Sequence, residues 1–131
     1  MRLLLDTHIW LWSLLEPERL AEPVVRLFED PETEIWLSPI SLWELSLLSK
    51  RKKVVLNLPV DEWVAEALAR APMREAHVTY EIAMETGSIE LPHRDPADRF
   101  LAATAKVFDL TLVTADERLL ALQHISLLSN R

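Results

Sequence analysis

Cysteine is absent from this 131-residue chain, and glycine occurs only once, as Gly87. Without cysteine the protein has no disulfides, no zinc–thiolate centre and no thiol nucleophile, which is consistent with a cytoplasmic location. One glycine cannot form the glycine-rich loops that bind the phosphates of nucleotide cofactors. The sequence therefore disfavours disulfide scaffolds, cysteine enzymes and most nucleotide-dependent enzymes.

Long apolar runs are also missing. The first residues, MRLLLDTHIWLW, are apolar, but Asp6 and His8 interrupt them and no small-residue cleavage site follows. We therefore expect neither a signal peptide nor a membrane-spanning helix, and no membrane partner.

Positive charge is scarce relative to negative charge, with 14 Lys and Arg against 21 Asp and Glu and a net charge of −7. Such a balance disfavours a nucleic-acid partner, because affinity for phosphates comes mainly from basic residues. Carboxylates gathered around a metal ion would reverse that local sign, and the basic residues cluster at Lys50–Lys53. Alternatively, the acidic surplus serves a basic partner protein.

Half of the residues are apolar and no linker or repeat divides the chain, so we expect one domain over residues 1–131. Short apolar runs predict strands at residues 2–5, 34–37, 111–113 and 125–128, with a brief extended segment at 76–78. Helices are predicted at residues 8–15, 23–30, 41–50, 60–71, 80–86, 97–108 and 116–122. This alternation predicts an α/β fold, a three-layer α/β/α domain with a mostly parallel central sheet.

Several helix ends carry expected capping residues. Ser38 or Ser41 is expected to cap the third helix, and Asp61 the fourth. Gly87 is expected to end the fifth helix in a left-handed conformation.

Four acidic residues stand at strand ends or helix starts. Asp6 ends the first strand and Asp116 follows the strand at 111–113, while Glu44 and Asp98 lie in the first turns of their helices. Ligand sites in open α/β sheets form outside the carboxyl ends of the strands, so all four can meet at one edge. Two like charges 4 Å apart cost about 4 kcal/mol at an effective dielectric near 20, so such a cluster needs a cation or raised pKa values. Oxygen ligands favour Mg²⁺ or Mn²⁺, which suits phosphodiester hydrolysis.

Four segments of the chain resemble the motifs of PIN-domain ribonucleases, in family order. They are MRLLLDTH around Asp6, ISLWE ending at Glu44, HRDPADRFLAATA around Asp98 and LVTAD ending at Asp116. The DTH start and the HRDPADR segment are similar to VapC-type toxins of toxin–antitoxin pairs, and the resemblance covers essentially the whole chain. It implies a PIN-like parallel-sheet fold, Mg²⁺ or Mn²⁺ as cofactor, an RNA substrate, endoribonuclease activity and inhibition by a small antitoxin.

By match of motif, the resemblance implies that Asp6 and Asp98 are the firmest metal ligands. Glu44 and Asp116 would complete the acidic set, Asp116 as a further ligand, directly or through water, and Thr114 would hydrogen-bond the cluster or a water. Asp95 competes with Asp98 for a place near the ion, although Asp95-Pro96 is more typical of a helix-entry turn.

Plainer interpretations stay open for the same acids, because Asp6 and Asp116 could be simple helix caps and Asp98 a first-turn acid that stabilises the helix dipole.

Basic residues near these motifs are candidate RNA contacts. Arg99 and Arg118 suit bidentate phosphate contacts but could equally form salt bridges. Lys52 is interpreted mainly as part of a charged helix end, and only secondarily as an RNA contact. His8 and His93 could ligate metal or donate protons. His93 could also touch phosphate, whereas His8 is interpreted as a helix-packing residue.

The chain is rich in tryptophan. The five residues are Trp10, Trp12, Trp36, Trp43 and Trp63. They could stack unpaired bases, but most are expected in the core or an interface. Trp10 and Trp12 face different sides of one helix, so one of them is expected to contact an antitoxin or a second copy in a homodimer.

Three other functions compete with a nuclease toxin. A catalytically idle PIN-like module that binds RNA or protein would retain the fold without the activity, although all four acids are present. A receiver-like phosphoacceptor domain would need a Lys after a late strand, which is missing, and a DNA flap nuclease would need additional segments.

Overall fold

The computed structural model describes residues 1–92 and 94–131, so the phosphate contact considered for His93 lies outside the described residues. One five-stranded parallel sheet has the order β3-β2-β1-β4-β5. Its strands are β1 (Arg2–Leu5), β2 (Glu34–Leu37), β3 (Arg74–Glu75), β4 (Thr111–Thr114) and β5 (Leu127–Ser129).

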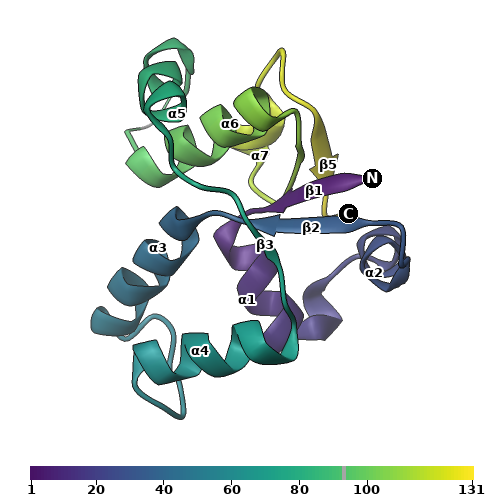
Figure 1. Ribbon diagram of the computed structural model, residues 1–131, viewed down its shortest axis with the longest axis vertical. Helices are drawn as coiled ribbons and strands as arrows, with labels where there is room; N and C mark the ends of the chain where they lie inside the picture. Colours follow the sequence, from purple (N-terminus) through teal and green to yellow (C-terminus); the bar gives the residue numbers. More distant parts are fainter. Residues whose placement is uncertain (93) are drawn as a thin grey trace.

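Helices cover both faces of this sheet (Figure 1). The helices are α1 (Thr7–Leu15), η1 (Pro17–Arg19), α2 (Glu22–Glu29), α3 (Pro39–Lys50), α4 (Val60–Arg70), α5 (Tyr80–Glu85), η2 (Thr86–Ser88), α6 (Pro96–Phe108) and α7 (Glu117–Leu120). Helices α1 to α4 lie on one side of the sheet and α5 to α7 on the other. This confirms the predicted α/β/α fold, with a sheet that is parallel throughout.

Strand β1 occupies the centre of the sheet because it is apolar on both faces. Leu3 and Leu5 pack into the core on the side of α1 and α4, whereas Leu4 packs into the core on the side of α6. Side chains alternate between faces along a strand, so three consecutive leucines fill both layers. All three are completely buried.

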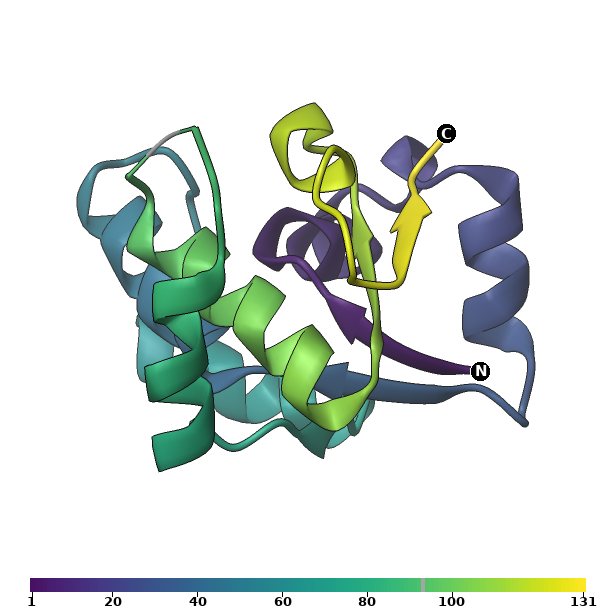
Figure 2. The ribbon, with the colours of Figure 1, turned by 90° about the horizontal axis from the view of Figure 1, so that it is seen from above.

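Strand β1 has neighbours from distant parts of the chain on its two sides. Strand β2 follows it on one side, and β4 returns to pair on its other side, so the order of the strands reverses between β1 and β4. Strands β1 and β4 end at the same edge of the sheet, where the Asp6 amide donates to the Val113 carbonyl at 3.0 Å. Such a switch point is where open α/β sheets form ligand sites. Figure 2 shows α2 and α5 at opposite ends of the molecule, with the strands between them.

Two strand positions differ from the prediction. The extended segment expected at 76–78 is instead β3 at Arg74–Glu75, and the last strand is Leu127–Ser129 rather than 125–128. Both are edge strands with half-buried or exposed residues, so they carry no strong apolar signal. Strand β3 is held by its pairing with β2, and the Ala76 amide donates to the Leu37 carbonyl at 2.9 Å.

Two predicted caps are wrong. Asp61 lies inside the first turn of α4, whose N-cap is Pro59, so it makes no cap. Gly87 lies in the short helix η2 with an ordinary negative φ, whereas left-handed residues follow α3 at Lys52, with φ 57°, and α6 at Asp109, with φ 53°. For the third helix, Ser38 is the cap rather than Ser41, since its hydroxyl accepts from the Ile40 amide at 3.1 Å.

Along the part of the chain that the structure describes, no helix combines the length and apolar character needed to cross a bilayer.

Candidate metal centre

A pocket of about 290 Å³ lies at the carboxyl ends of β1 and β4. Its lining residues are Asp6, His8, Trp12, Glu44, Asp95, Asp98, Ala115, Asp116 and Arg118. Sequence segments more than 100 residues apart therefore meet at one place, and all four predicted acids line it.

Asp6 is the pocket acid that follows β1, and two hydrogen bonds fix its carboxylate. Only 7% of the residue is exposed, and its carboxylate accepts from the Thr7 amide at 2.8 Å, which makes it the N-cap of α1. Its second oxygen accepts from the Thr114 hydroxyl at 2.7 Å. The capping role considered from the sequence is thus real, and it coexists with a place in the pocket.

Glu44 reaches the pocket from α3. The Thr7 hydroxyl donates to Glu44 Oε1 and lies 2.9 Å from the Ser41 hydroxyl. Thr7 therefore links the start of α1 to α3, and it orients the Glu44 carboxylate toward the other acids.

Asp95 and Asp98 both come from the start of α6. Asp95 is the N-cap of this helix and accepts from the Ala97 amide at 3.0 Å. Asp98 lies one turn further along and is only 6% exposed. Both line the pocket, but only Asp98 is buried there without serving as the helix cap.

Asp116 is tied to its neighbours on the outer side. It caps α7 by accepting from the Arg118 amide at 2.9 Å, and it also accepts from the Arg118 guanidinium at 2.9 Å and 3.2 Å. The Asp116 amide donates to the Thr114 hydroxyl at 3.0 Å. Thr114, which is completely buried, therefore connects Asp6 to Asp116, and its hydrogen bond to Asp6 is of the kind that the motif resemblance implies. The hydrogen bond to Asp116 raises the pKa of Arg118.

The pocket is electrostatically strained when it holds no cation. Burial raises the pKa of Asp6 to about 6, and the nearby Asp98 charge adds to this increase, while the Thr114 hydrogen bond opposes it. Burial also raises the pKa of Glu44 to about 7, with further contributions from the charges of Asp6, Asp95 and Asp98. A cation among these groups would remove both penalties.

The donor set fits a hard divalent cation, because every acidic donor is a carboxylate oxygen. Within residues 1–92 and 94–131, however, no three acidic or histidine side chains are grouped closely enough to hold one ion between them. Mg²⁺ commonly keeps several waters and uses one or two carboxylates. The pocket therefore fits an ion that these residues hold partly through water.

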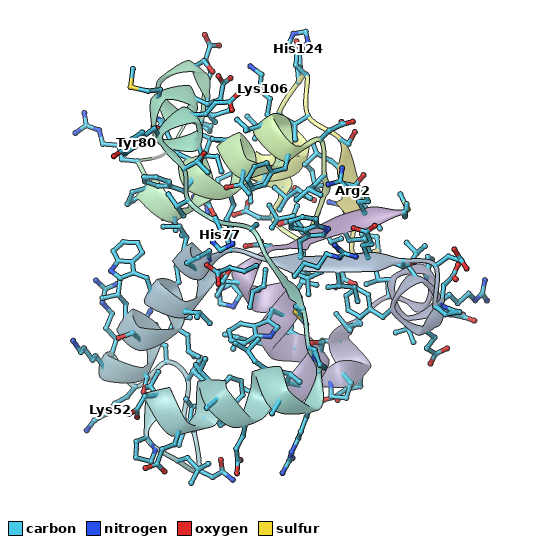
Figure 3. All side chains as sticks on the ribbon, viewed as in Figure 1. Arg2, Lys52, His77, Tyr80, Lys106 and His124 are labelled. Atoms are coloured by element: carbon cyan, nitrogen blue, oxygen red, sulfur yellow. The ribbon has the colours of Figure 1, made fainter. Side chains whose placement is uncertain are left out.

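Two of the basic residues predicted to contact RNA lie away from the pocket. Lys52 follows the end of α3 that points away from the sheet (Figure 3). The Arg99 guanidinium donates to the carbonyls of Ile89 at 2.5 Å and Leu91 at 3.4 Å, so it secures the segment before α6. Of the three candidates, only Arg118 lines the pocket.

Two aromatic residues, His8 and Trp12, line the pocket although neither was among the predicted site residues. His8 is exposed and lines the pocket, so the packing role inferred for it is wrong. Trp12 lies beside it, and their spacing of four residues on one helix was the signal that places them on a common face. Trp10 is buried in the protein's own core against Trp63, with ring centroids 5.7 Å apart, so it is not a partner contact.

Comparison with known proteins gives consistent results. The family model described as PIN domain matches residues 3–125. The chain is 32% identical over 124 residues to Ribonuclease VapC22 of Mycobacterium tuberculosis, covering 92% of each protein.

Solved structures match the fold over almost the whole chain. One is VapBC2 from Rickettsia felis bound to a promoter DNA fragment, with a TM-score of 0.72, 17% identity and 98% of both chains covered. Another is VapBC-1 from nontypeable Haemophilus influenzae, with a TM-score of 0.66, 16% identity and 98% of both chains covered.

Proposed function

The chain belongs to the PIN domain family, and we propose that it is a metal-dependent endoribonuclease that acts as the toxin of a toxin–antitoxin pair. The observation that carries this proposal is the pocket in which Asp6, Glu44, Asp98 and Asp116 meet at the switch point of the sheet. The similarity to Ribonuclease VapC22 extends over 92% of the chain, which supports the same activity here.

The metal ligands in this proposal are Asp6, Asp98 and Asp116, which hold Mg²⁺ or Mn²⁺ directly or through water. A bound divalent cation supplies Lewis acidity to a phosphodiester and neutralises charge that develops during its hydrolysis. Thr114 keeps Asp6 and Asp116 in register through its two hydrogen bonds. Asp95 supports the site as the cap that fixes the start of α6.

Glu44 is the proposed proton acceptor for the attacking water. Glu44 lines the pocket beside the proposed ligands, and a bound cation would lower its pKa from about 7, so the carboxylate is ionised and able to accept a proton at neutral pH. The Thr7 hydroxyl holds its side chain in place. Arg118 lies at the rim, where its planar guanidinium suits a bidentate contact to the RNA phosphate.

The proposed partner is a small antitoxin that blocks this pocket in the cytoplasm. Related folds were solved as VapBC assemblies, which supports a partner of this kind. The net charge of −7 favours basic residues on the antitoxin surface. We also propose a homodimer, as the resemblance to the toxin family suggests.

A cleavage assay with purified protein tests the proposal. We expect RNA to be cleaved with Mg²⁺ or Mn²⁺, and not in EDTA or by Asp98→Asn. The control is Asp61→Asn, an exposed acid on α4 that does not line the pocket. Wild-type expression should arrest growth, and the Asp98→Asn variant should not. Metal binding without cleavage of any RNA would favour an idle binding module instead.

A further inference from the structure

A second pocket, of about 830 Å³, adjoins the metal pocket. It is lined by residues within 88–92, by Lys106 and by residues within 117–125, and we name it the α7 groove. Arg118 lines both pockets, so the two meet at this residue. Lys106 and His124, two residues of the groove, lie on the same side of the molecule (Figure 3). Ligand sites commonly have volumes of about 300–1,000 Å³, so the α7 groove has room for a ligand the size of a nucleotide.

The α7 groove combines an apolar floor with a polar rim. Ile89, Leu122 and Ile125 line it and belong to the apolar cluster that packs on α6, and Ile89 is only 5% exposed. Gln123 and His124 are exposed and line the groove as well. Such a surface suits a nucleobase, because the faces of a base contact apolar side chains while its edges form hydrogen bonds.

The turn that carries Gln123 has an unusual backbone. His124 has a φ of 65°, in the left-handed region that is unfavourable for residues with a Cβ. The residues on both sides of it, Gln123 and Ile125, line the groove. Strained backbone of this kind is concentrated at functional sites, so the turn favours a binding role for the groove.

The α7 groove is less acidic than the chain as a whole. The described residues that line it include two basic and two acidic side chains, which are Lys106, Arg118, Glu90 and Glu117. By comparison, the whole chain has 14 basic against 21 acidic residues, and five carboxylates line the metal pocket. Since carboxylates repel phosphates, an RNA strand that leaves the metal pocket past Arg118 meets less repulsion than it would over an acidic surface.

We propose that the α7 groove binds the base of a nucleotide next to the scissile phosphate, and that Gln123 recognises which base it is. This proposal rests on the proposed nuclease function and adds a residue that determines the cleavage sequence. Arg118 stands at the junction of the two pockets, where the phosphate between the two nucleotides would pass. The Gln123 side chain carries both a carbonyl acceptor and an NH2 donor, so it can distinguish bases by their edges.

Cleavage of an oligoribonucleotide library of random sequence, with product ends identified by sequencing, tests the recognition. We expect the wild type to prefer particular bases at a position beside the cut. Gln123→Ala should lower kcat/KM for the preferred base by about 5- to 150-fold, as expected for one bidentate amide–base contact, and should remove the preference at that position alone. Asn57→Ala, which removes an exposed amide outside the groove, is the matched control and should keep the wild-type preference.

Photocross-linking locates the base directly. A 4-thiouridine is placed at each position of the preferred oligoribonucleotide in turn and bound to Asp98→Asn, which should not cut it. Cross-links from a position on one side of the cut should map to residues within 88–92 or 121–125. The corresponding position on the other side of the cut should give no cross-link to these segments.

The two measurements distinguish failure of the groove from failure of the proposed function. If the wild type cuts no RNA but cross-links map to the α7 groove, the groove stands as an RNA site and the nuclease proposal fails. If RNA is cut but all cross-links map elsewhere, or if Gln123→Ala keeps the wild-type preference, the groove fails and the nuclease proposal stands. A wild type that cuts all sequences equally would also overturn base recognition. If Gln123→Ala keeps the cleavage preference but escapes the cognate antitoxin, the groove belongs to that partner and the proposal is wrong.

Discussion

Replacing Asp6 with Asn should stabilise the metal-free protein at neutral pH. Asp6 is buried, and its pKa is raised from 3.8 to about 6. The folded protein thus holds this proton where the unfolded chain has released it. Stability is lost as the pH rises from about 4 to about 6, since the native state binds more protons in this range. At 1.36 kcal/mol per pKa unit, the charged carboxylate costs the fold about 3 kcal/mol above pH 6.

Asn removes that cost and keeps the cap of α1, while its NH2 group replaces the oxygen that accepts from the Thr114 hydroxyl and so offsets part of the gain. An Asn side chain caps a helix about as well as Asp does, so it can still accept from the Thr7 amide. In EDTA at pH 8, Asp6→Asn should therefore be more stable than the wild type by up to about 3 kcal/mol. At pH 4.5 the difference should fall below about 1 kcal/mol, because the wild-type carboxyl is then protonated in the folded state.

Urea unfolding with and without Mg²⁺ measures these differences. Added Mg²⁺ should stabilise the wild type at pH 8 and leave Asp6→Asn nearly unchanged, since only the wild type has the full ligand set. The exposed control Asp61→Asn should change the unfolding free energy by less than about 0.5 kcal/mol. The reasoning is refuted if Asp6→Asn is less stable than the wild type at pH 8, or if the difference is the same at both pH values.

Three further predictions concern the pocket and the core. Thr114→Val should lower the unfolding free energy by about 1–3 kcal/mol and raise the pKa of Asp6, because it removes a hydrogen-bond donor to that carboxylate. Urea denaturation measures the first effect and an NMR pH titration the second, with Thr114→Ser as the conservative control. Mg²⁺ binding measured by calorimetry should be at least about ten-fold weaker at pH 6 than at pH 8, because Glu44, with a pKa of about 7, and Asp6, with a pKa of about 6, hold protons at the lower pH that a cation must displace. Trp10→Ala should cost about 3–5 kcal/mol in thermal or urea unfolding, since Trp10 is buried against Trp63.

The central strands were predictable because their chemistry is unambiguous. The leucines of β1 must be buried on both faces, and a short apolar run of this kind is typical of a central parallel strand. The edge strand β3 was misplaced because Arg74 and Glu75 are exposed and carry no apolar pattern. Its pairing with β2 depends on tertiary contacts that the local sequence does not encode.

The position of the acids followed from the strand ends, since Asp6 and Asp116 come after neighbouring parallel strands. The sequence favoured Asp98 over Asp95 as the ligand, because Asp95-Pro96 is typical of a helix-entry turn, but it could not show which carboxylate lies closer to an ion, since helix capping and metal binding favour the same residue types at a helix start. The structure shows Asp95 as the cap and Asp98 as the buried acid. The sequence predicted that Trp10 and Trp12 face different sides of α1, but it could not place Trp12 in the pocket, because an outward-facing aromatic residue is equally typical of an interface.

The most direct test of the central claim is a Mn²⁺ titration that follows bound metal by EPR and RNA cleavage in the same samples. We predict that both signals rise together, that EDTA removes both, and that Asp98→Asn loses both while it remains folded. Cleavage that persists in EDTA or in Asp98→Asn would contradict a metal centre at this pocket.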